Sequence, residues 1–80
     1  MNEVELKNAI FAGLREVAPE SDPATLRPDQ NIRETLDIDS FDFLSFLIAL
    51  HAKLGVEIPE ADYGRLGTLD AMVRYLAPRL

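Results

Sequence analysis

One serine stands among acidic residues where a polar segment turns into an apolar run, in the stretch LDIDSFDFLSFLIAL. Ser40 has Asp37, Asp39 and Asp42 close to it along the chain. A serine hydroxyl becomes a nucleophile when a nearby base removes its proton, but the only histidine, His51, lies eleven residues further on. Along one helix that separation is roughly 16 Å, too far for a Ser–His pair. The stretch therefore does not predict a hydrolase.

The same residues also have a purely structural interpretation. Asp39 or Ser40 can accept hydrogen bonds from the free N–H groups that open a helix, and Asp42 lies where a carboxylate favours the positive helix end. The spacing lacks the glycine and distal glutamate of a calcium loop, so we expect no metal site. Three carboxylates also oppose the binding of free phosphate. Two interpretations remain: a helix cap, or a hydroxyl that another protein modifies.

The composition of the 80 residues narrows the possible partners. Fourteen acidic against eight basic residues give a net charge of −6. This charge disfavours nucleic acid and anionic membranes as partners and favours basic proteins. A requirement for solubility explains the negative charge equally well. The chain has no cysteine, which excludes disulfides and thiolate zinc sites and fits a cytoplasmic protein. No apolar run is long enough to span a bilayer. We expect one small monomeric domain over residues 1–80.

The spacing of apolar residues predicts an all-α fold. Three main helices are expected over residues 3–17, 40–54 and 69–76, and a short helical turn within 60–66. Residues 18–39, punctuated by three prolines, are expected to form a long loop that a few apolar side chains pin to the core. No alternating apolar pattern indicates a strand. The sequence thus predicts a four-helix bundle of three main helices and one short helix, with a long first loop.

The helix expected over 40–54 has more apolar surface than a small bundle can bury. Phe41, Leu44 and Ile48, with Ala52, lie outside its core-facing sector and form a second face, here called the apolar strip. An apolar strip left exposed on a small acidic protein indicates a docking surface, unless residues 18–39 cover it. The expected core residues are Val4, Ile10, Phe11, Leu14, Val17, Leu26, Ile32, Leu36, Ile38, Phe43, Phe46, Leu47, Leu50, Leu54, Leu69, Met72, Val73 and Leu76.

The residues around Ser40 resemble those of the acyl carrier and peptidyl carrier proteins. That family has Asp-Leu-Gly-X-Asp-Ser-Leu ahead of a long helix, where this chain has Thr-Leu-Asp-Ile-Asp-Ser-Phe at 35–41. GVEIPEAD resembles the turn after the family's helix, and TLDAMVRYL resembles its final helix. The resemblance covers nearly the whole chain and implies an acyl-carrier-type bundle.

The resemblance implies that Ser40 carries 4'-phosphopantetheine, transferred from coenzyme A by a phosphopantetheinyl transferase that uses magnesium. The thiol of the arm would hold an acyl or aminoacyl group as a thioester, and the chain itself would catalyse nothing. Implied partners are that transferase, an acyl- or aminoacyl-loading ligase, and synthases or acyltransferases. Asp39 would help to receive the transferase, while Asp42 and the apolar strip would face partner enzymes. If Ser40 is only a cap, the alternative is a helical interaction module without a prosthetic group.

Three departures from the family pattern refine this expectation. Asp37 replaces the usual glycine, which is tolerable because Asp adopts turn geometries readily. Phe41 replaces leucine and enlarges the apolar contact beside the arm. Carriers of bacterial fatty acid synthesis tend to line this helix with glutamates, whereas the matching stretch here holds Ser45, His51, Ala52 and Lys53. We therefore expect docking through apolar contact and a specialised lipid or secondary-metabolite pathway.

Overall fold

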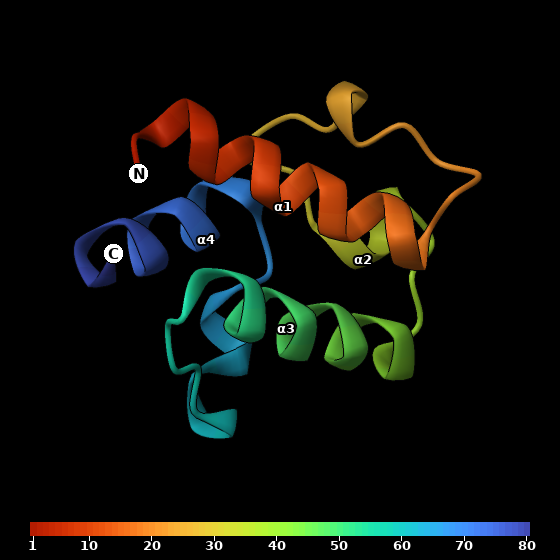
Figure 1. The fold of residues 1–80 in the computed structure, drawn as a ribbon. Helices are drawn as coiled ribbons and strands as arrows, with labels where there is room; N and C mark the ends of the chain where they lie inside the picture. The colour runs from red at the N-terminus through yellow and green to blue at the C-terminus, as the bar shows by residue number, and fades with distance from the viewer.

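The computed structural model describes all 80 residues and contains helices but no strand (Figure 1). Three helices are long: α1 (Glu3–Val17), α3 (Ser40–Leu54) and α4 (Leu69–Leu76). Four short segments complete the chain: η1 (Pro23–Thr25), α2 (Ile32–Thr35), η2 (Glu60–Arg65) and η3 (Ala77–Arg79). The predicted all-α bundle is confirmed, with the three long helices at the expected bounds.

α1 and α3 run antiparallel and pack along each other, and α4 contacts the N-terminal half of α1 (Figure 1). The close approach of α1 to α3 depends on Gly13, because a Cβ there would lie 2.9 Å from Cε1 of the buried Phe46. Both chain ends lie on the same side of the bundle (Figure 1). Between the helices, 18 buried residues form one continuous hydrophobic cluster.

Most of the expected core is buried, but the face predicted for α1 is partly wrong. Val4 is 67% exposed, while Leu6 and Ala9 are buried beside Ile10 and Leu14. At about 100° per residue, Val4 lies roughly 160° around the helix from Leu6, so the two cannot share one face. Four further core residues were not expected: Val56, Ile58, Leu66 and Tyr75. Phe11, Val17, Leu54 and Val73 are only partly buried.

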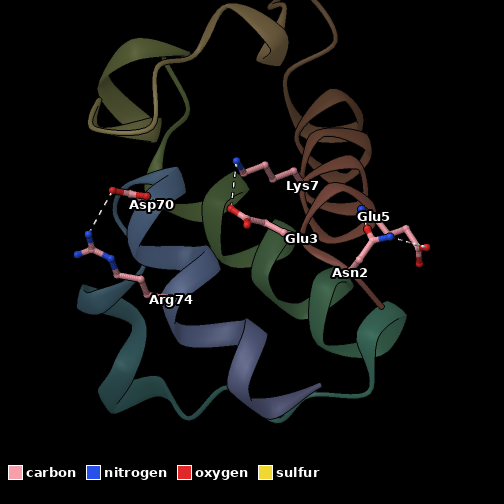
Figure 2. A network of polar contacts seen from close by, with 6 residues as sticks. All are labelled: Asn2, Glu3, Glu5, Lys7, Asp70 and Arg74. Carbon is pink, nitrogen blue, oxygen red and sulfur yellow. Dashed lines mark hydrogen bonds and ion pairs between the residues drawn. The ribbon is translucent and has the colours of Figure 1, made fainter.

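Polar contacts on the outer surface support the helix ends without contributing much stability. Asn2 caps α1 by accepting a hydrogen bond from the N–H of Glu5 at 2.8 Å. Lys7 pairs with Glu3 at 3.3 Å on α1, and Arg74 pairs with Asp70 at 3.5 Å on α4 (Figure 2). Exposed pairs one helical turn apart each contribute about 0.3–0.5 kcal/mol. Burial of apolar surface therefore dominates the stability of the bundle.

The connection between α1 and α3 is more ordered than the expected loop, because it contains η1 and α2. Leu26, Ile32, Leu36 and Ile38 are all buried, as predicted. The backbone N–H of Ile32 donates to the carbonyl of Gly67 at 2.9 Å, and the N–H of Asp70 donates to the carbonyl of Pro28 at 3.0 Å. The connection is thereby fastened to the start of α4.

A tight turn at Asp37 leads from α2 into α3. Asp37 has a φ of 54°, in the left-handed region, at the position where the carrier pattern has glycine. The N–H of Ile38 donates to the carbonyl of Arg33 at 2.9 Å, which is the hydrogen bond of a Schellman helix ending. Leu36 and Ile38 are buried on either side of the turn. The expectation that Asp tolerates this turn agrees with the observed backbone.

The turn generates a stability prediction. We expect Asp37→Val to lower the free energy of unfolding by about 1–2 kcal/mol, because a β-branched residue is strained in the left-handed region. Asp37→Gly should change it by less than half as much, since glycine adopts this φ freely but has more freedom in the unfolded chain. Urea unfolding followed by circular dichroism measures both. An Asp37→Val variant as stable as the wild type would contradict the prediction.

Candidate functional site

The start of α3 decides between the two interpretations of the serine. Asp39 is the N-cap: its Oδ1 accepts a hydrogen bond from the N–H of Asp42 at 2.7 Å. Ser40 is the first residue inside the helix and is exposed to solvent. The cap is therefore made by Asp39, and the Ser40 hydroxyl is left accessible.

The surroundings of Ser40 contain no histidine and no cluster of metal-ligating side chains. His51 is exposed in the last turn of α3, at the far end of the helix from Ser40. Asp37, Asp39 and Asp42 do not converge, and no group of three or more His, Asp or Glu side chains lies close enough together to hold a metal ion. What the geometry offers is an accessible alcohol at a helix start.

A groove of about 370 Å³ opens beside Ser40, between α3, η2 and the connection that precedes α3. Its α3 side is apolar, with Phe43, Leu44 and Leu47, whereas Asn31 and Arg33 supply polar groups on the opposite side. Tyr63 and Gly64 of η2 and Gly67 complete the lining. A flexible group attached to Ser40 would find a partly apolar surface next to it.

The η2 wall of this groove is held against α4 by Tyr75. The hydroxyl of Tyr75 donates to Oδ2 of Asp62 at 2.6 Å, and this hydrogen bond, with burial, raises the pKa of Tyr75 above its ordinary value. The guanidinium of Arg79 stacks on the Tyr75 ring at 3.8 Å. The neutral Tyr75 hydroxyl therefore donates the hydrogen bond that holds η2 against α4. Sequence reasoning did not single out Tyr75, although its spacing from Leu69 and Met72 places it on the buried face of α4.

The apolar strip is exposed, as predicted. Phe41 is 75% exposed, Ile48 58% and Leu44 39%, and Ala52 is exposed beyond them. The connection from α1 to α3 does not cover these side chains. The opposite face of the same helix buries Phe43, Phe46, Leu47 and Leu50, so α3 has one face for the core and one facing solvent.

Comparison with known proteins identifies the family. The sequence profile described as "Phosphopantetheine attachment site" matches residues 8–76. The acyl carrier protein of Myxococcus xanthus is 32% identical over 73 residues, covering 88% of this chain and 92% of that protein. The chain belongs to the phosphopantetheine-binding acyl carrier family.

Other acyl carrier proteins show similar agreement. That of Micrococcus luteus is 32% identical over 73 residues, covering 88% of this chain and 90% of that protein. That of Wolinella succinogenes is 31% identical over 71 residues, covering 85% of this chain and 93% of that protein. Agreement over most of both chains extends the family assignment to the whole helical bundle.

Membership of the acyl carrier family gives the chain a carrier role and a covalently attached 4'-phosphopantetheine. The residues at the start of α3 fit such a group, because the exposed Ser40 provides an alcohol for a phosphodiester and the groove provides space beside it. Phosphopantetheinyl transferases and synthases are the general partners of acyl carriers. No helix in the structure combines the length and apolar character needed to cross a membrane.

Proposed function

We propose that this chain carries acyl or aminoacyl groups as thioesters on a 4'-phosphopantetheine arm attached to Ser40. The observation that supports this most strongly is that Asp39, and not Ser40, caps the helix. The exposed Ser40 hydroxyl is therefore not needed for the cap and is accessible to another enzyme. A phosphopantetheinyl transferase would join the Ser40 oxygen to the phosphorus of coenzyme A next to pantetheine. The serine proton is lost and adenosine 3',5'-bisphosphate leaves.

In this proposal the chain presents its cargo and other enzymes do the chemistry. The prosthetic group supplies a terminal thiol on a long flexible tether. A tethered substrate reaches successive active sites at a high effective concentration without being released. The only histidine, His51, is at the other end of α3 from Ser40. We propose that residues 1–80 form one such carrier domain.

The surface around Ser40 is proposed to receive the partner enzymes. Asp39 and Asp42 place two carboxylates beside the serine, which favours a basic surface on the transferase. The apolar strip continues from there along α3 and offers side chains that a partner's apolar pocket can bury. Partners would include an acyl- or aminoacyl-loading ligase and synthases or acyltransferases.

We further propose a specialised pathway. Housekeeping fatty acid carriers tend to present glutamates along this helix, whereas here exposed positions hold Ser45, His51, Ala52 and Lys53. With little negative charge along α3 beyond Asp42, long-range steering by this helix is weak. Recognition then depends on how well the apolar strip fits a partner's surface. Such a fit is expected for a ligase or synthase dedicated to this carrier.

Modification of Ser40 tests the proposal. The chain is co-expressed with a broad-specificity phosphopantetheinyl transferase, and the intact mass is recorded. We expect the wild type and Ser45→Ala to gain one phosphopantetheine group and Ser40→Ala to gain none. Ser45→Ala is a matched control because Ser45 is exposed on the same helix. A wild-type chain that stays unmodified while a control carrier is loaded would favour the interaction module instead.

The strip generates a second prediction. Ile48→Glu should slow cargo loading by the cognate ligase at least tenfold, because a carboxylate would have to be buried in the partner's apolar pocket. Its free energy of unfolding should change by no more than about 0.5 kcal/mol, since Ile48 is exposed. Phe46→Ala, which removes a core side chain of the same helix, should cost about 3–5 kcal/mol. Loading kinetics and urea unfolding measure the two effects; a strongly destabilised Ile48→Glu variant would place Ile48 in the core.

A further inference from the structure

The proposed attachment at Ser40 raises an electrostatic problem that the chain must solve. A phosphodiester carries one negative charge, and Asp37, Asp39 and Asp42 are all within three residues of Ser40. These like charges repel a phosphate group placed among them. The positive end of α3 offsets part of this repulsion, and a cation beside the phosphate would hold the start of the arm to the protein.

The groove beside Ser40 has one cationic side chain in its lining, that of Arg33. Arg33 belongs to α2, and its Nε donates a hydrogen bond to the carbonyl of Ile38 at 3.3 Å. That bond holds the guanidinium against the turn that leads into α3, two residues before the serine. The tight turn at Asp37 therefore brings Arg33 to the groove in which Ser40 lies.

The guanidinium of Arg33 is not engaged by a carboxylate. The protein has four ion pairs, and they involve Lys7, Arg27, Arg65 and Arg74. Because only Nε is used in the bond to Ile38, both Nη groups remain free to donate elsewhere. A guanidinium presents its N–H groups in a planar fork that matches two oxygens of a phosphate.

The other basic side chains do not line the groove beside Ser40. His51 and Lys53 lie in the last turn of α3, at the opposite end of the helix from Ser40. Arg65 pairs with Asp62 at 3.8 Å and lies over the Tyr75 ring. None of these residues lines the groove beside the serine.

We infer that Arg33 is a positioning residue that pairs with the phosphodiester on Ser40 and directs the start of the arm along the groove. The inference rests on the proposed attachment and adds to it a residue outside the Asp-Ser motif. Asn31 lines the same groove, and its Oδ1 already accepts from the N–H of Glu34 at 3.0 Å, so its amide N–H₂ can add a second donor.

The experiment uses the full chain loaded with phosphopantetheine, with loading verified by intact mass. The ³¹P resonance of the loaded protein and the side-chain Nε–H resonance of Arg33 are compared among the wild type, Arg33→Gln, Arg33→Lys and Arg27→Gln. Arg27→Gln is the matched control, because Arg27 is exposed in the same connection, pairs with Asp29 at 3.8 Å and does not line the groove.

We expect loading to shift the Arg33 Nε–H resonance of the wild type. In Arg33→Gln the ³¹P resonance should move towards that of the same phosphodiester in the loaded chain unfolded in urea, and Arg33→Lys should lie between the two. Arg27→Gln should match the wild type. Added salt should move the wild-type ³¹P resonance in the same direction as Arg33→Gln, because an exposed ion pair is screened.

Three results would overturn the inference, and they distinguish a wrong pairing from a wrong function. If the loaded wild type and Arg33→Gln have the same ³¹P resonance, or loading leaves the Arg33 Nε–H resonance of the wild type unmoved, the pairing is wrong while the carrier function stands. The second measurement needs no variant and therefore does not depend on the folding of Arg33→Gln. If the wild type gains no phosphopantetheine, the proposed function fails together with the inference.

Discussion

The path of the backbone between α2 and α3 determines what Ser40 can do. Leu36 and Ile38 are buried on either side of Asp37, whose left-handed backbone reverses the chain at the end of α2. Asp39 then satisfies the first turn of α3 by accepting the N–H of Asp42. With the turn anchored by two apolar side chains and the cap made by a neighbour, Ser40 lies at the surface with its hydroxyl free. The Ser40 hydroxyl is therefore accessible because Leu36 and Ile38 anchor the turn before it and Asp39 caps the helix.

The helix that presents Ser40 has one buried face and one exposed apolar face. Its buried face, centred on Phe46, packs against α1 at the close contact that Gly13 permits. Its other face leaves the apolar strip in solvent. A domain this small has little core to spare, so leaving large apolar side chains exposed next to Ser40 forgoes burial that would stabilise it. The proposed docking of partner enzymes on the apolar strip would give this arrangement a physical reason.

The groove adds a third element, and it depends on contacts far apart in sequence. η2 contributes no buried residue of its own and is held through the Tyr75–Asp62 hydrogen bond and through Leu66, which follows it into the core. On the opposite side, the α2 turn brings Arg33 to the groove. The space beside Ser40 is therefore bounded by segments from both halves of the chain.

Sequence reasoning predicted the bounds of the three long helices, but it missed the four-residue α2 and part of the buried face of α1. The 15-residue helices α1 and α3 carry enough turns for their bounds to be predicted, and the two faces of α3 were separated correctly. The four-residue α2 has no periodic signal, although the capping pair of Asn31 and Glu34 could have indicated it. The hydrogen bond of Tyr75 to Asp62 and the position of Arg33 in the groove were not predictable, because they arise from how separate segments pack.

The account is tested most directly by locating the prosthetic group on the chain. The loaded protein is digested, and the peptide that carries phosphopantetheine is fragmented in a mass spectrometer to assign the modified side chain. The account predicts that the added mass lies on Ser40 alone, with Ser21 and Ser45 unmodified. Phosphopantetheine found on another side chain would contradict it, because the turn at Asp37 and the cap at Asp39 would then present the wrong residue.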